Sequence, residues 1–93
     1  MRESEIERYL KAQLEPHGFL YYKFTSPANA GVPDRIIVAD GAVIFCELKR
    51  PGQKIRPLQR YQHDLIRAQN VPVIVVDSYE SADALIASLK KGG

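Results

Sequence analysis

Residues 31–49 read GVPDRIIVADGAVIFCELK and contain two apolar runs separated by Asp40-Gly41. An Asp-Gly pair between two strand-like runs is typical of a tight β-hairpin. In an antiparallel hairpin the start of the first strand lies beside the end of the second. We therefore expect Asp34 and Glu47 to be neighbours, although they lie far apart in the sequence.

The end of the second run adds a cation to this pair of carboxylates. Side chains on a strand alternate between its two faces, so Glu47 and Lys49 should point the same way. Taken singly, these features have ordinary explanations: Asp after Pro is common at turns, and Glu-x-Lys is common on exposed strand ends. An apolar strand that runs directly into charged residues nevertheless places those charges beside the core, where unpaired charges are costly.

Two carboxylates and a lysine in one place indicate a metal-dependent phosphodiesterase. Neighbouring carboxylates raise each other's pKa unless a cation lies between them. Their hard oxygen atoms are the ligands that Mg²⁺ or Mn²⁺ prefers. The ion would acidify the attacking water and neutralise the phosphate, while Lys49 would orient that water or stabilise the transition state.

The charge distribution favours a nucleic acid as the partner. The net charge is only +2. The segment from Leu48 to His63, however, has no acidic residue and carries Lys49, Arg50, Lys54, Arg56 and Arg60. A solvated loop would also explain such a basic segment. Its position directly after the proposed catalytic strand favours phosphate binding.

Length and composition limit the remaining possibilities. We expect a single nuclease domain over residues 1–93. The one cysteine, Cys46, alternates away from Glu47 and should be a buried small hydrophobe, which excludes a disulfide framework and a zinc site. The charged N-terminus and the lack of a long apolar run predict no secretory signal and no membrane association. We expect a cytoplasmic protein.

The rest of the chain predicts helices and strands around the hairpin. Helical spacing and capping residues predict helices over 4–15, 57–70 and 81–90. Residues 19–24 and 71–77 are strand-like, and 25–32 form a loop beside the metal site. Because a helix connects the catalytic strand to residues 71–77, that last strand should lie parallel to a neighbour, which predicts a mixed sheet.

Three segments together resemble a known family. Gly31-Val32-Pro33-Asp34-Arg35, then 45–52 (FCELKRPG), then Pro57-Leu58-Gln59 are similar to the VRR-NUC branch of the PD-(D/E)XK nuclease superfamily in its small stand-alone form. The resemblance covers nearly the whole chain. It implies an α/β fold with a restriction-endonuclease-like αβββαβ core, whose mixed central sheet is flanked by helices. It also implies Mg²⁺ or Mn²⁺ as cofactor, and a homodimer that cleaves branched DNA such as Holliday junctions or flaps. The likeness further implies a bacterial or phage-infected cell as the setting.

The resemblance also implies roles for individual residues. Asp34, Glu47, Lys49 and Gln59 would be catalytic. The ion would be held by Asp34, Glu47, the backbone carbonyl of Leu48 and an acidic residue of the first helix. For that last ligand we choose Glu7, because its neighbourhood resembles the first helix of archaeal junction resolvases. Glu3, one turn earlier on nearly the same face, is the fallback. DNA would be bound by Arg35, Arg50, Lys54, Arg56 and Arg60.

Two side chains of the helix over 57–70 share one face. Gln59 and His63 are four residues apart. The resemblance implies that Gln59 positions the attacking water or a phosphate, although an exposed Gln is the ordinary alternative. For His63 we favour an exposed or packing role over that of a proton shuttle. The alternative for the whole chain is a catalytically inactive module that binds nucleic acid or a protein partner and keeps a nuclease fold.

Overall fold

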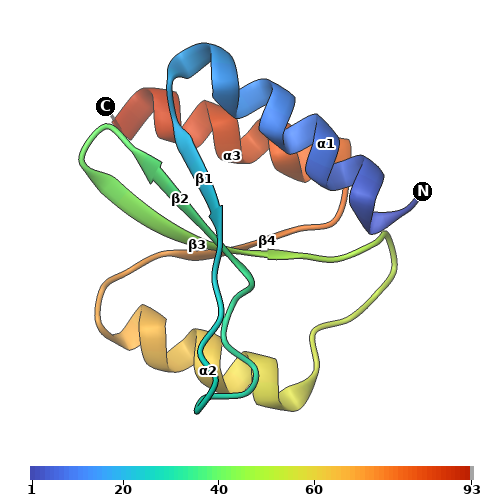
Figure 1. Ribbon diagram of the computed structural model, residues 1–93, viewed down its shortest axis with the longest axis vertical. Helices are drawn as coiled ribbons and strands as arrows, with labels where there is room; N and C mark the ends of the chain where they lie inside the picture. Colours follow the sequence, from blue (N-terminus) through green and yellow to red (C-terminus); the bar gives the residue numbers. More distant parts are fainter. Residues whose placement is uncertain (93) are drawn as a thin grey trace.

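The computed structural model describes residues 1–92 and shows a four-stranded sheet between two layers of helix (Figure 1). Helices α1 and α3 cover one face of the sheet, and α2 lies on the other. The elements, in chain order, are α1 (Glu3–Leu14), the short 3-10 helix η1 (Glu15–His17), β1 (Leu20–Lys23), β2 (Arg35–Ala39), β3 (Ala42–Leu48), α2 (Pro57–Ala68), β4 (Val73–Val76) and α3 (Tyr79–Gly92). The predicted α/β fold is confirmed.

The sheet is mixed and has the strand order β1-β2-β3-β4. Strands β1, β2 and β3 are antiparallel, whereas β4 pairs parallel to β3 with Leu48 opposite Val76. The β2–β3 connection is the predicted tight hairpin. Asp40 and Gly41 both have positive φ angles, 48° and 85°, as a two-residue turn that follows the strand twist requires. This hairpin brings the start of β2 beside the end of β3.

The hydrophobic core lies between the sheet and the pair α1 and α3. It is built mainly from aliphatic side chains of these layers, namely Ile6, Leu10, Leu14, Ile37, Ala39, Ile44, Cys46, Leu48, Val76, Ala82, Leu85 and Ile86. Cys46 is fully buried among them, as its alternation with Glu47 predicts, and burial raises the pKa of its thiol to about 12. Successive residues of β3 thus face the core and the opposite side of the sheet in turn, and Glu47 faces that opposite side.

Helix α3 begins two residues earlier than the sequence pattern predicts. Ser78 acts as its N-terminal cap, because Ser78 Oγ accepts a hydrogen bond from the Ser81 N–H at 3.0 Å. The Ser81 hydroxyl in turn accepts the Asp77 N–H. The apolar spacing alone starts at Ser81, so it does not reveal the capping turn. In residues 1–92, no helix is both long and apolar enough to cross a membrane.

The loop between β1 and β2 returns to the sheet through a close contact with α2. Gly31 has a φ of 92°, and a Cβ atom built on it would lie 2.7 Å from the Leu58 carbonyl oxygen. Only glycine fits there without displacing the backbone. Val32 and Pro33 then lead into Asp34 at the start of β2. The Gly-Val-Pro-Asp motif thus delivers the Asp34 carboxylate to the end of β3.

Candidate active site

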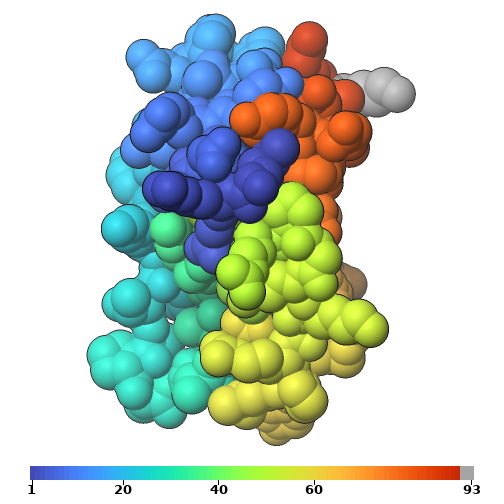
Figure 2. All heavy atoms as spheres, turned by 90° about the vertical axis from the view of Figure 1, so that its right-hand side faces the viewer, coloured from blue at the N-terminus to red at the C-terminus, as the bar shows by residue number. Residues whose placement is uncertain are grey.

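A polar cleft of about 350 Å³ opens at the carboxyl end of β3. Asp34, Glu47 and Lys49 all line it, so the structure brings together the three residues that the hairpin predicts. Its other walls are formed by Glu3, Gly31, Val32, Leu48, Gln53, Arg56 and Gln59. Figure 2 shows how the start of the chain, in dark blue, lies beside the yellow-green segment that follows β3. The cleft is therefore assembled from four separate stretches of sequence.

Asp34 is fixed by the backbone of the strand opposite. Its Oδ1 accepts a hydrogen bond from the Leu48 N–H at 3.3 Å, and its Oδ2 lies 3.6 Å from Arg35 Nη1. Burial raises the pKa of Asp34, although the Arg35 charge and the Leu48 N–H oppose this shift. The carboxylate is one-third exposed, so it remains open to the cleft.

Glu47 is more deeply buried, with only 4% of its surface exposed. Burial, followed by the negative charge of Asp34, raises its pKa to about 7. Gln59 Nε2 donates to Glu47 Oε2 at 3.3 Å, whereas Oε1 is buried and has no hydrogen-bond partner among the described residues. The charges of Lys49 and Arg56 oppose this rise in pKa but do not cancel it, so the ionised form of Glu47 stays costly.

A divalent ion fits this donor set. No group of three or more acidic, histidine or cysteine side chains converges on one point in residues 1–92. Two carboxylates that face an open, polar cleft are nevertheless sufficient for Mg²⁺, which keeps several waters and binds through one or two carboxylates. The raised pKa of Glu47 and its orphaned Oε1 are consistent with a site built to receive positive charge.

Lys49 enters the cleft at the point where β3 leaves the sheet. Its backbone N–H donates to the Val76 carbonyl at 3.0 Å, which extends the β3–β4 pairing past Leu48. The residue is 5% exposed, and the ion pairs formed within the described part of the chain do not include it. The cleft thus contains an ammonium group beside two carboxylates.

Gln59 reaches the site from the first turn of α2. Its Oε1 accepts the Arg56 N–H at 2.9 Å, and this bond directs the amide nitrogen toward Glu47. Both ends of the amide are thus engaged within the protein. In this structure Gln59 holds the Glu47 carboxylate, and it lines the cleft that a water or a phosphate would enter.

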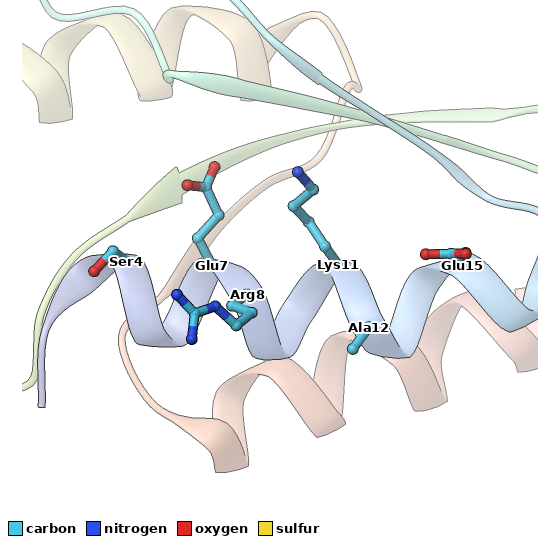
Figure 3. A pocket seen from close by; sticks show the side chains of 6 residues that line it. All are labelled: Ser4, Glu7, Arg8, Lys11, Ala12 and Glu15. Atoms are coloured by element: carbon cyan, nitrogen blue, oxygen red, sulfur yellow. The ribbon is translucent and has the colours of Figure 1, made fainter.

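The two candidate residues of α1 occupy different places. Glu3 lines the cleft, and its charge is among the causes, after burial and Asp34, that raise the Glu47 pKa. Glu7 lines a separate hollow, where Figure 3 shows it projecting from α1 toward the sheet together with Lys11. Its Oε2 accepts hydrogen bonds from Tyr21 and Arg35. Burial by itself would raise the pKa of Glu7, but these hydrogen bonds outweigh it and the pKa is lowered.

Arg35 does not project outward as a DNA-binding residue would. Its Nε lies 2.8 Å from Glu7 Oε2, its Nη1 donates to the Asp34 carbonyl, and only 12% of its side chain is exposed. The guanidinium therefore links Glu7 to Asp34 inside the protein. The other basic candidates, Arg50, Lys54, Arg56 and Arg60, are all exposed, and Arg56 also lines the cleft.

His63 is the residue whose place the sequence did not reveal. It is fully buried, and its Nε2 lies 3.5 Å from Glu47 Oε1. Burial, followed by the Arg67 charge, lowers its pKa. The four-residue spacing from Gln59 correctly places both side chains on one face of α2. Nothing in that spacing tells which face packs against the sheet.

Comparison with known proteins agrees with the fold and the motifs. No family model matches the chain. The chain is 40% identical over 88 residues to "Putative nuclease p44" of Acyrthosiphon pisum secondary endosymbiont phage 1, which covers 94% of this chain and 95% of the phage protein. A solved structure described as a VRR_NUC domain superposes with a TM-score of 0.82 at 30% identity, covering 91% of this chain and 94% of that one.

These likenesses define a nuclease-type α/β domain. The chain belongs to the VRR-NUC family and spans nearly the whole length of the two relatives it matches.

Proposed function

We propose that this protein is a Mg²⁺- or Mn²⁺-dependent DNA endonuclease that hydrolyses phosphodiester bonds. The observation that carries the proposal is the cleft itself, in which Asp34, Glu47 and Lys49 meet and the pKa of Glu47 stays raised despite the charge of Lys49. Family membership and the name of the phage relative support a nuclease. Metal dependence and the choice of DNA are inferred from the chemistry of the cleft and from the resemblance.

The ion would be held by Asp34, Glu47 and the backbone carbonyl of Leu48. We propose Glu3 in place of Glu7 as the acidic residue of α1, because Glu3 lines the cleft and Glu7 is committed to Arg35 and Tyr21. When bound, the ion would neutralise charge on the scissile phosphate and acidify the attacking water. Lys49 would stabilise the negative charge that develops on the phosphate in the transition state.

Exposed basic residues next to the cleft would bind the DNA backbone. Arg56 lies on its wall, and Arg50, Lys54 and Arg60 flank it in sequence. Such contacts act on phosphates of any sequence. Contacts of this kind suit a substrate that is recognised by its shape. We therefore propose branched DNA, such as a four-way junction or a flap, as the substrate, and a homodimer as the active form.

Substitution of the two carboxylates tests the proposal. Asp34→Asn and Glu47→Gln keep the size of each side chain but remove the charge that would hold the ion. We expect both variants to lose cleavage, while DNA binding in Ca²⁺ or EDTA survives or improves because negative charge facing the phosphates is removed. The measurement is cleavage of a labelled junction in Mg²⁺ or Mn²⁺ beside a gel-shift assay. Wild-type-like cleavage by either variant would refute the proposed site.

A further inference from the structure

Helix α2 buries two polar residues and leaves three large apolar residues exposed. Its buried residues are Gln59 and His63, whereas Leu58, Tyr61 and Leu65 are 51%, 59% and 48% exposed. A helix that packs on a sheet ordinarily does the reverse. The burial of these two polar side chains must therefore be explained by what they touch on the sheet.

Both polar side chains reach the same carboxylate. Gln59 Nε2 donates to Glu47 Oε2 at 3.3 Å, and His63 Nε2 lies 3.5 Å from Glu47 Oε1. In the described residues, Glu47 Oε1 and the two ring nitrogens of His63 are buried without a hydrogen-bond partner. Buried polar atoms are costly when unpaired. A hydrogen bond between His63 Nε2 and Glu47 Oε1 would satisfy two of these three atoms.

The chemistry of the pair allows one arrangement when Glu47 is ionised. A carboxylate only accepts hydrogen bonds, and a neutral imidazole has a single N–H to donate. The carboxylate therefore selects the tautomer of His63 that has its proton on Nε2. An approach of about half an ångström would bring the two atoms to ordinary hydrogen-bond distance.

We propose that His63 is a positioning residue that donates from Nε2 to Glu47 Oε1 and, with Gln59 on the other oxygen, orients the carboxylate for the divalent ion. This inference rests on the proposed metal-dependent nuclease activity. One donor would hold each oxygen of Glu47, and the carboxylate would keep further lone pairs for the ion. Hydrogen bonds of this kind to a ligating carboxylate typically tune metal affinity.

His63 acts through Glu47 and not on the substrate. It is fully buried and does not line the cleft, so neither a phosphate nor the attacking water in the cleft would contact it. A proton shuttle would need such contact. The expected consequence of losing the imidazole N–H is therefore weaker binding of the ion, with little change in the binding of DNA.

Three substitutions separate the hydrogen bond from the packing. His63→Phe keeps a ring of similar shape but has no N–H. His63→Gln places an amide nitrogen near the position of Nε2. His63→Asn carries the same amide one methylene short of it. All three proteins are checked for folding by circular dichroism and thermal melting before use.

The primary measurement is Mn²⁺ binding to the protein alone, by electron paramagnetic resonance of the free ion. We expect His63→Phe and His63→Asn to weaken Mn²⁺ binding about 10- to 100-fold, and His63→Gln to stay within a few-fold of the wild type. In cleavage assays the Mn²⁺ concentration at half-maximal rate should rise in parallel. The KM for DNA and the kcat at saturating Mn²⁺ should change little.

The outcomes are distinguishable. A folded His63→Phe protein that binds Mn²⁺ like the wild type would overturn the inference and leave the proposed function intact. If His63→Phe does not fold, equal Mn²⁺ affinity of His63→Gln and His63→Asn would overturn it instead. A wild-type protein that neither binds Mn²⁺ nor cleaves DNA would overturn the proposed function, and the positioning role with it.

Discussion

Glu47 is the residue at which the strand, the helix and the second carboxylate meet. Strand β3 buries it, Asp34 faces it, and Gln59 approaches it from α2. Burial makes its ionised form costly, and the neighbouring charge adds to that cost. A divalent ion in the cleft would offset this cost, so metal binding and protein stability should be coupled.

The stability of the metal-free protein should fall as pH rises toward the raised pKa of Glu47. That pKa is about 7 in the folded protein against 4.5 ordinarily, so between these values the folded state holds a proton that the unfolded state has lost. The free energy of unfolding should then decrease by up to about 1.4 kcal/mol for each pH unit within this window. Urea unfolding in EDTA from pH 5 to 8 measures this decrease.

The matched control for this pH dependence is Glu47→Gln, which cannot titrate. Its stability should decline less over the same range, because the Glu47 contribution is gone. The raised Asp34 pKa remains, and the lowered His63 pKa acts in the opposite direction. Parallel pH profiles for the wild type and Glu47→Gln would show that the Glu47 pKa is not raised. Saturating Mg²⁺ should remove most of the decline in the wild type, since the ion favours the ionised carboxylates.

Lys49 should differ in kind from the basic residues beside it. Because Lys49 lies inside the cleft, Lys49→Ala should lower kcat by about a hundredfold or more, with Mn²⁺ binding largely kept. Lys54→Ala and Arg56→Ala should instead weaken DNA binding. The slope of the logarithm of the binding constant against the logarithm of the salt concentration should become less steep by about one for each lost phosphate contact. Equal losses of kcat in all three variants would mean that Lys49 is only another phosphate contact.

Among single residues, those whose position depends on local geometry could be placed from the sequence. Asp34 and Glu47 adjoin because of the Asp40-Gly41 turn, which is readable from two residues. Glu3 and Glu7 lie on nearly the same face of α1, so periodicity could not separate them. Their environments differ because Tyr21 of β1 and Arg35 of β2 donate hydrogen bonds to Glu7. These contacts depend on how α1 packs on the sheet, which the sequence pattern does not give.

At the scale of elements, the loop before β2 is held by a single close approach to α2. Gly31→Ala would place a methyl group against the Leu58 backbone and also strain a positive φ. Gly52→Ala is the matched control, because Gly52 has a φ of 81° but open space around the new methyl. Left-handed backbone alone costs about 1–2 kcal/mol for a non-glycine residue.

We expect Gly31→Ala to lose clearly more stability than Gly52→Ala in urea unfolding, because only Gly31→Ala meets a backbone atom. Cleavage should also fall, since Asp34 lies three residues after the displaced glycine. Equal losses of stability for the two variants would show that the contact between the loop and α2 is unimportant.

Helix α2 shows where reasoning from apolar patterns stops. Its position and its shared Gln59 and His63 face could be predicted from spacing. The burial of that face could not, because apolar residues ordinarily mark the packed side and here Leu58, Tyr61 and Leu65 are exposed. The arrangement of the strands is easier to predict from the sequence, since a hairpin followed by a helical crossover leaves few arrangements for a mixed sheet.

At the scale of the whole molecule, the described chain measures 33 × 31 × 20 Å. One such surface offers few contacts to a branched DNA, and two copies about a two-fold axis would double them. Sedimentation at micromolar concentration should therefore give twice the chain mass. At equal salt, binding should favour a four-way junction over a linear duplex of the same length. A monomer that cuts junctions in symmetric pairs would contradict the dimer.

The most direct test of the central claim is metal add-back to the wild-type protein. The protein is stripped with EDTA, dialysed, and mixed with a labelled four-way junction while Mg²⁺ or Mn²⁺ is titrated back. The predicted result is no cleavage without the ion and cleavage that rises to saturation with it, with Glu47→Gln inactive throughout. Cleavage that persists in EDTA, or none at any concentration of either ion, would contradict a metal-dependent nuclease built on Asp34, Glu47 and Lys49.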